Sequence, residues 1–345
     1  MRPVHRIVAN GQDITDLLND RLLLARTVDK PGIDSDEFEL RIDDRDGAVA
    51  LPRKGVKIEV WLGWKSDKLT LLGTYTVDEV EVSGPPDTIV IRSKSGETRG
   101  SAKETRNGSW EGVTLASIVA DVAKRNNLEP VCTVETLVER ADQLGESDIN
   151  FITRLANQHG CTAKVADGKL IVLQKDEGKS ATGKDLPTIT INRTDVSRWQ
   201  FRFSDEGVKK GARAGYKDEK GDLKVIDVGN DSAPAGTPPV HTDRHLHPNK
   251  SAAEASAKAR IDAFNRSTAS VRLDMNGRTD VFAESKITAQ GFKEGADGTY
   301  LVESVEQTWT QSGWTTSVEC NAGNKGKADA KGKKEKGPLK VIDVG

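Results

Sequence analysis

The chain has 345 residues, of which 30% are charged and 35% hydrophobic, and a formal net charge of −2. This near-neutral balance argues against binding to nucleic acid or to an anionic membrane by charge alone. No run approaches the roughly 18 apolar residues of a membrane-spanning helix, and the length allows two or three domains. The three cysteines are odd in number and far apart, which favours reduced thiols over a disulfide framework.

The first 99 residues are predicted to form a β domain. Residues 1–99 contain short runs that are rich in β-branched and aromatic residues, with turn-forming residues between them. The runs are FELRI, KIEVWLGW, LTLLGTYTVDEVEV and TIVIRS, and the turns are DDRDG, WKSDK and SGPPD. Short strands joined by such turns favour an antiparallel sheet.

Residues 100–175 are predicted to form a small α/β domain. Thr114 can cap one helix and Ser147 a second, and Gly160 follows the second helix as a stop signal. The apolar face of the first helix would consist of Leu115, Ile118, Val119 and Val122. Asp167-Gly168, between two strand-like runs, indicates a hairpin.

Strand-like runs return in residues 176–321, which we predict to form a second β domain with a loop and a helix inserted. The segment 230–250 is rich in Pro, Gly and Asp and is predicted to be the loop. Residues 251–267 consist largely of strong helix formers and are predicted to be the helix. Residues 322–345 begin with a lysine- and glycine-rich stretch that lacks large apolar side chains, which predicts a flexible tail.

The chain contains an internal repeat. Residues 73–81 read GTYTVDEVE and residues 298–306 read GTYLVESVE, with six of nine positions identical. Two further matches lie upstream in the same order, FELRIDD (38–44) with ASVRLDM (269–275) and VKIEV (56–60) with SKITA (285–289). Three ordered matches indicate that the two β domains are related, and a trimer of such a chain would present six similar units in a ring.

Both copies of the repeated strand break their alternation at the same place. In the first copy Tyr75 and Val77 are two positions apart, but the next apolar residue, Val80, follows three positions later. The second copy has the same spacing in Tyr300, Val302 and Val305. A shared slip of one residue indicates a β-bulge in each copy, a device that bends a strand. We expect these six residues to lie in strands that line the ring and form its interface.

A second repeat lies at the end of the chain. Residues 217–229 and 333–345 match at 11 of 13 positions and share LKVIDVG. The first copy is predicted to be the turn and return strand of a hairpin. The last copy, with Leu339, Val341 and Ile342, is either a neutral duplication or a strand that adds to the sheet edge of another subunit or partner.

The residues that could take part in catalysis or bind a metal do not form a recognisable catalytic or cofactor-binding pattern. His241, Asp243, His245 and His247 cluster in the predicted loop 230–250, where nothing in the sequence would hold them together as metal ligands. G-x-S-x-G, H-E-x-x-H, G-x-G-x-x-G and Walker motifs are absent from the sequence. The lysine-rich tail has no interleaved aromatic residues that could stack on bases. We therefore expect no catalytic residue, metal or cofactor and no specific nucleic-acid partner.

The α/β domain resembles a known family. ESDINFITRLANQHGCTAKVADGKLIVL (146–173) is similar to the signature of the phage late control protein D family, the hubs of contractile tail baseplates. This family resembles the hubs of R-type pyocins and the N-terminal region of type VI secretion VgrG spikes. The matching residues are Glu146, Ser147, Asp148, Phe151, Arg154, Leu155, Ala156 and Gly160.

The resemblance implies a mainly β protein with an α/β insertion, in which each chain contributes two tube-like antiparallel β-barrels. It implies a homotrimer whose pseudo-sixfold ring adapts a hexameric tail tube protein to a trimeric spike protein. The tape measure and baseplate wedge proteins are further possible partners. The expected location is the baseplate of a phage virion or a tailocin particle, made in the host cytoplasm.

Three alternative functions remain open from the sequence. The first is a type VI-like spike hub module, the second a peptidoglycan-degrading tail enzyme, and the third a DNA-binding regulator. The location of four tryptophans also remains open, because Trp61, Trp64, Trp309 and Trp314 suit either a core or an interface.

Overall fold

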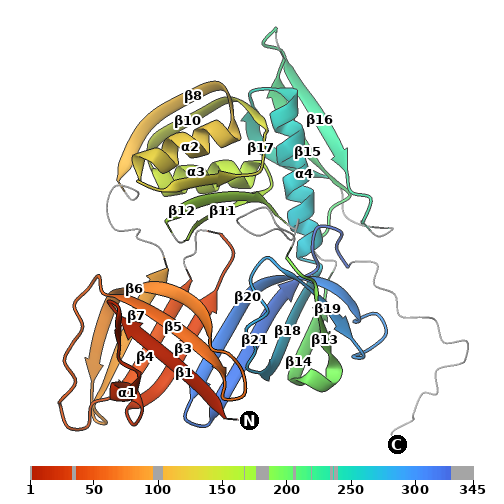
Figure 1. The fold of residues 1–345 in the computed structure, drawn as a ribbon. Helices are drawn as coiled ribbons and strands as arrows, with labels where there is room; N and C mark the ends of the chain where they lie inside the picture. Colours follow the sequence, from red (N-terminus) through yellow and green to blue (C-terminus); the bar gives the residue numbers. More distant parts are fainter. Residues whose placement is uncertain are drawn as a thin grey trace, which may run out of the picture.

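The computed structural model describes residues 2–32, 36–95, 104–166, 168–175, 186–204, 207–218, 220–233, 236 and 240–327. The described residues form four hydrophobic clusters. Two β modules lie side by side in one layer, and two α/β units lie over them (Figure 1). We call these four units the first module, the second module, the middle domain and the insertion sheet.

The first module contains seven strands in the order β3-β4-β7-β6-β5-β1-β2. The alternation is clearest on β4, which buries Phe38, Leu40 and Ile42, as expected for a sheet with one face on a core. The strands are β1 (Pro3–Ala9), β2 (Gln12–Asp13), β3 (Leu22–Asp29), β4 (Glu37–Asp43), β5 (Lys57–Trp64), β6 (Thr70–Ser83) and β7 (Thr88–Ser95), with the short helix α1 (Thr15–Leu18) after β2.

The second module repeats the strand order of the first. Its order is β14-β18-β21-β20-β19-β13, which matches β3-β4-β7-β6-β5-β1 strand for strand. The first strands differ in direction, because β1 is antiparallel to β5 whereas β13 is parallel to β19. The strands are β13 (Ile189–Asn192), β14 (Val196–Phe203), β18 (Ala269–Asn276), β19 (Lys286–Gln290), β20 (Gly298–Thr310) and β21 (Gly313–Asn321).

The predicted pair of β-bulges is confirmed. On β6 the pairing with β7 shifts register between Val77 and Glu79. On β20 the pairing with β21 shifts between Val302 and Ser304. These are the same steps of the repeated sequence, so both copies bend at the same residue.

The ladders correct one of the three sequence matches. Phe38 on β4 lies opposite Ser93 of β7, and Val271 on β18 lies opposite Cys320 of β21. Ser93 and Cys320 are equivalent, because each pairs with the valine that precedes the bulge. Phe38 therefore corresponds to Val271, two residues away from the alignment predicted from the shared arginine. A shift of two residues leaves every side chain on its original face, so the hydrophobic pattern could not reveal it.

The middle domain has the predicted helices and hairpin. Thr114 and Ser147 cap α2 and α3 through their side-chain oxygens, and Gly160 follows α3 with a φ of +68°. Strands β11 and β12 pair antiparallel from Cys161 to Gln174. The elements are β8 (Thr105–Thr114), α2 (Leu115–Arg125), β9 (Glu129–Cys132), β10 (Leu137–Ser147), α3 (Asp148–Gln158), β11 (Cys161–Ala166) and β12 (Lys169–Gln174).

The insertion sheet lies between β14 and β18 in the sequence. It contains β15 (Gly211–Lys217), β16 (Leu223–Gly229) and β17 (His241–His247), covered by α4 (Lys250–Arg266). The hairpin β15–β16 and the helix α4 confirm two predictions. The prediction of a loop over 230–250 is wrong for residues 241–247, which pair parallel with β15. This parallel partner is distant in the sequence, so no local signal marked the segment as a strand.

The fold is therefore mainly β with an α/β insertion, as the sequence predicts. The pairings among the described strands join both modules into one sheet, and the closure of each module into a barrel stays a prediction. Insertion sheet and second module have separate hydrophobic clusters, so residues 176–321 contain two packing units. None of the described helices is long and apolar enough to cross a membrane.

Candidate assembly surfaces

The two modules are joined by a β-ladder, which we call the inter-module ladder. The C-terminal half of β20 pairs antiparallel with β3, from Val305 opposite Asp29 to Trp309 opposite Ala25. An ion pair of 2.8 Å joins Arg26 Nη2 to Glu306 Oε2 on the outer face of this ladder. Because of this pairing, both modules share one 13-stranded sheet.

Side chains from the second module complete the core of the first. Trp309 and Trp314, on the hairpin β20–β21, are 8% and 2% exposed and pack in the hydrophobic cluster of the first module. The ring of Trp64 packs at a tilt against Trp314, with ring centroids 5.2 Å apart, and its indole N–H donates to the carbonyl of Gly277 at 2.8 Å. Trp309 and Trp314 are therefore core residues, and Trp64 is partly buried against the same cluster. Trp61 is also partly buried, but it is outside the cluster and lies beside the guanidinium of Arg6.

A buried polar network holds Trp314 in place. Gln307, 4% exposed, accepts hydrogen bonds at Oε1 from the Trp314 indole at 2.9 Å and from the Thr316 hydroxyl at 2.6 Å. Its amide donates to the carbonyl of Arg278 at 2.6 Å. A satisfied network of this kind fixes side-chain positions, because each buried group would lose its partner in any other arrangement.

Asp29 connects three of the four units. On β3, it accepts a hydrogen bond from the backbone N–H of Ala283 in the second module at 2.8 Å. Its other oxygen pairs at 3.1 Å with Lys164 of the middle domain, which also pairs with Asp36 at 2.9 Å. Burial alone would lower the pKa of Lys164, but the two carboxylates outweigh it and raise that pKa. The lysine thus stays charged and holds the middle domain against the first module.

The residues of the signature that suggested the family cap and hold the helix α3 of the middle domain. Ser147 caps α3, and Glu146 pairs with Arg154, about two turns further along the helix. Asp148 is fully buried and accepts hydrogen bonds from Gln143 and Asn126, both at 2.9 Å. These residue types are therefore explained by capping and by one satisfied buried carboxylate.

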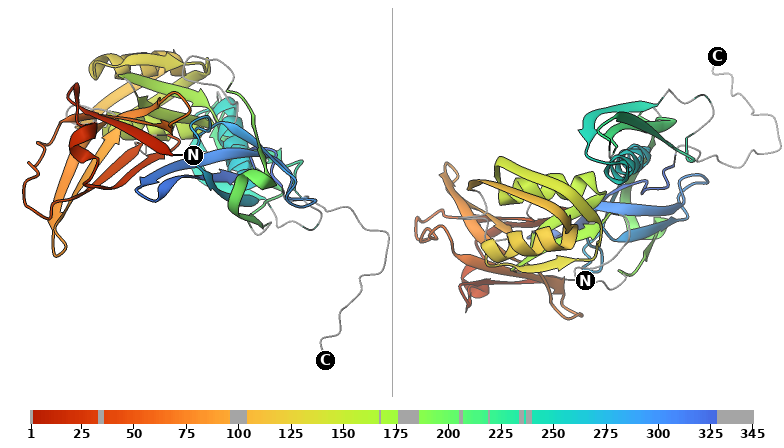
Figure 2. Two further views of the ribbon diagram at one scale, coloured as in Figure 1. Left: turned by 60° about the horizontal axis from the view of Figure 1, so that its bottom comes forward. Right: turned by 90° about the horizontal axis from the view of Figure 1, so that it is seen from above.

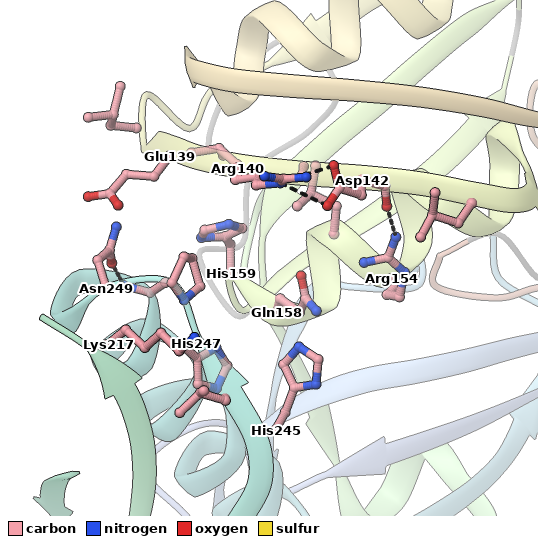
Figure 3. Close-up of a pocket in the computed structure, with 18 of the residues that line it drawn as sticks. Glu139, Arg140, Asp142, Arg154, Gln158, His159, Lys217, His245, His247 and Asn249 are labelled. Atoms are coloured by element: carbon pink, nitrogen blue, oxygen red, sulfur yellow. Dashed lines mark hydrogen bonds and ion pairs between the residues drawn. The ribbon is translucent and has the colours of Figure 1, made fainter. Parts of the chain in front are cut away.

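A cleft of about 740 Å³ separates the middle domain from the insertion sheet. Figure 3 shows His159, after α3, on one side, and His245 and His247 of β17 on the other. His247 contacts Asp243 at 3.3 Å, whereas His241 packs against Phe264. In the described part of the chain, no three His, Cys, Asp or Glu side chains are placed to hold a metal ion.

The buried His159 predicts that the free energy of unfolding depends on pH. Burial, and second the nearby His247, lower the pKa of His159 below its usual value of 6.5. The folded state therefore resists protonation of His159 more than the unfolded state does, so the free energy of unfolding should fall as the pH drops below about 6.5. His159→Gln should reduce this slope in denaturant titrations between about pH 7.5 and 5. Gln158→Ala, at a neighbouring position that does not titrate, is the control, and an equal slope in both variants would contradict the prediction.

Comparison with known families identifies the chain. The family model described as phage tail baseplate hub (GPD) matches residues 51–313, which include strands β5 to β7 of the first module, all of the middle domain and most of the second module. The chain belongs to the phage tail baseplate hub family. It is a structural tail hub protein, as the resemblance of residues 146–173 implied.

Individual relatives agree with this assignment. The probable baseplate hub protein of Escherichia phage P2 is 31% identical, over 92% of this chain and 93% of that protein. A 43 kDa tail protein of prophage MuSo2 from Shewanella oneidensis has a TM-score of 0.70 at 16% identity, over 92% of this hub and 98% of that chain. The E. coli c3393 protein, a type VI secretion component, has a TM-score of 0.56 at 12% identity, over 87% of this hub and 73% of that chain. The two structures show likeness of fold alone.

Five of the predicted interface residues of the hub lie in the cores of its modules. Tyr75, Val77, Tyr300, Val302 and Val305 are all at most 3% exposed, and Val80 is partly buried against the first core. Five of these side chains therefore pack within their own module. A contact between subunits along these strands has to use strand edges or outward-facing residues instead.

The predicted tail lies mostly outside the described residues. Leu339, Val341 and Ile342 belong to the part that is not described. Residues 322–327, by contrast, pack on the hub: Asn265 donates to the carbonyl of Asn324 at 2.9 Å, and the Lys327 N–H donates to Thr268 at 2.6 Å. The start of the predicted linker is thus anchored to the end of α4.

Proposed function

We propose that three copies of this chain close into a ring of six similar β modules. The ring adapts the sixfold tube of a contractile tail to a threefold central spike. The observation that carries this proposal is the doubling of the sheet: two modules with the same strand order and the same bulge lie side by side in one layer (Figure 2). A threefold protein can make near-equivalent contacts with a sixfold partner only if each chain offers two similar faces.

The proposed partners follow from this geometry. A trimeric spike protein would contact one side of the ring and a hexameric tail tube protein the other, with tape measure and baseplate wedge proteins as further neighbours. The site of action is the tail baseplate of a phage or tailocin particle. The role we propose is mechanical and not catalytic, in agreement with the baseplate hub name of the phage P2 relative.

Light scattering on the purified full chain, alone and mixed with the spike protein from the same genome, tests the ring. The expected mass of the assembled hub is about three times that of the 37.4 kDa chain. A chain that keeps its single-chain mass in both samples would remove the proposal.

A further inference from the structure

Among the unpaired strand edges in the described part of the chain, one on β6 and one on β14 correspond to the inter-module ladder. The strand β6 pairs with β5 from Thr70 to Thr76, while its last residues, Val80 to Ser83, pair with β7 alone. The equivalent half of β20 carries the inter-module ladder to β3. At the other end of the sheet, β14 pairs with β18 alone, and it lies on the side of the second module that faces away from the first (Figure 1).

The two free edges are the repeats of the two edges that already pair. Thr27 of β3 lies opposite Phe38, and Phe201 of β14 lies opposite Val271. Because Phe38 and Val271 correspond, Phe201 takes the place of Thr27, and β14 is the second module's β3. The bulges agree, since the ladder shifts at Leu22/Leu24 in one module and at Val196/Arg198 in the other.

We propose that β14 of one copy pairs antiparallel with the C-terminal half of β6 in a second copy, in the register of the inter-module ladder. This inference rests on the proposed function and names the contact that closes the ring. Transferring the observed pairs to their repeats gives Val80 opposite Phe203, Glu81 opposite Arg202, Val82 opposite Phe201, Ser83 opposite Gln200 and Gly84 opposite Trp199.

The inward face of this contact is apolar on both strands. Val82, Trp199 and Phe203 are 57%, 39% and 40% exposed in the single chain, and Trp199 and Phe203 lie on either side of Phe201 in one aromatic cluster. Among the equivalent side chains of the inter-module ladder, Ala25, Thr27, Gln307 and Trp309 are at most 8% exposed. Asp29, the equivalent of Phe203, keeps 31% of its side chain exposed. The pairing would therefore bury the exposed apolar side chains of both edges.

The sizes of the facing residues are also complementary. In the inter-module ladder, the large Trp309 lies opposite the small Ala25. In the proposed contact the order is reversed, because Gly84 on β6 would face Trp199 on β14. Each position thus pairs one large with one small residue, which fills a similar volume in both contacts.

The outward face carries opposite charges. Glu81 and Arg202 are both exposed and would lie directly opposite each other. In the single chain Glu81 and Glu79 share one cation, Arg92, at 2.9 and 3.2 Å, so a second arginine would balance the second carboxylate. The inter-module ladder has its own outward ion pair in Arg26 and Glu306.

The contact is head to tail, so it propagates. Within the chain, the C-terminal half of β20 pairs with the edge of β3. Between chains, the C-terminal half of β6 would pair with the equivalent edge of β14 in the next copy. Contacts of this kind form a closed ring when the rotation between units closes, and an open filament when it does not. Six modules from three chains close the ring that the proposed function requires.

Exchanging the charges tests the contact. Arg202→Glu and Glu81→Arg should each raise the concentration for half-assembly of the full chain by about tenfold or more in sedimentation velocity, because like charges then face each other. Combining the two substitutions should restore assembly. Arg244→Glu, an exposed arginine on the insertion sheet, should leave assembly unchanged. Circular dichroism and thermal midpoints show whether each variant is folded.

Disulfide formation tests the register. Ser83→Cys combined with Gln200→Cys places two thiols directly opposite each other, and oxidation should give covalent dimers and trimers on non-reducing gels. Ser83→Cys combined with Arg198→Cys is the off-register control and should link far less.

The outcomes separate the two proposals. If the wild-type chain forms a trimer that ignores the charge exchanges and cross-links no better in register than off it, this contact is wrong and the ring stands. If the wild-type chain does not assemble, alone or with the spike, both are wrong. If deletion of residues 338–345 abolishes assembly while the charge exchanges do not affect it, the tail and not β14 occupies the edge, which also overturns the inference.

Discussion

Replacing Trp314 by alanine should lower the free energy of unfolding by about 3–5 kcal/mol, the usual cost of truncating a buried tryptophan. The ring of Trp314 is 2% exposed and packs in the core of the first module. Its loss would also leave Gln307 without one hydrogen-bond donor in a buried site. The substitution lies in the second module, yet the first module should lose most of the packing.

Hydrogen exchange locates the effect of this substitution. Trp314→Ala should reduce protection in β4, β5 and β6 of the first module as well as in β21, together with a lower denaturation midpoint. Trp61→Ala is the matched control, because Trp61 is only partly buried and outside the hydrophobic clusters, and it should cost about 1 kcal/mol or less. Equal losses in both variants, or loss of protection confined to the second module, would show that the modules do not share a core.

Asp148→Ala should destabilise the middle domain by about 3–5 kcal/mol, as expected when one member of a buried charged network is removed. Asp148 is fully buried, and its carboxylate accepts from Gln143 and Asn126. Arg125 lies 3.4 Å away and adds a positive charge. Without the carboxylate, the buried amide of Gln143 keeps only its bond to the backbone carbonyl of Glu146.

Chemical denaturation monitored by hydrogen exchange of α2 and α3 would measure this loss, since Ile118 of α2 and Phe151 of α3 pack in the core of the same domain. Asp142→Ala is the control. Asp142 lies on the neighbouring strand, and its ion pair with Arg140 is largely exposed, so its removal should cost at most about 1 kcal/mol. Comparable midpoints for the two variants would mean that Asp148 does not hold the domain together.

Local signals in the sequence were sufficient for several elements. Ser147 and Gly160 bound α3 because a side-chain cap and a left-handed stop depend only on nearby residues. The bulges were predicted because the alternation of buried residues fails at the same step in two copies of one strand. Each of these features is determined within about ten residues of chain.

Other features depended on partners that are distant in the sequence. The strand β17 was read as a loop because its pairing with β15 involves residues about 30 positions away. Tyr75 and Tyr300 were expected at an interface, and the structure buries both in the modules' own cores. Periodicity shows that a face is apolar but not what covers it, so core and interface look alike in the sequence.

The sequence by itself determined that the chain holds two related β units around an α/β domain, because duplicated segments keep their caps, turns and alternation. Only the tertiary structure decided how the units meet. The inter-module ladder joins Val305 to Asp29 across most of the chain, and Trp309 and Trp314 leave their own module to complete the core of the other. Backbone edges form hydrogen bonds with whichever strand reaches them, largely independent of side-chain identity, so the choice of partner is visible only in three dimensions.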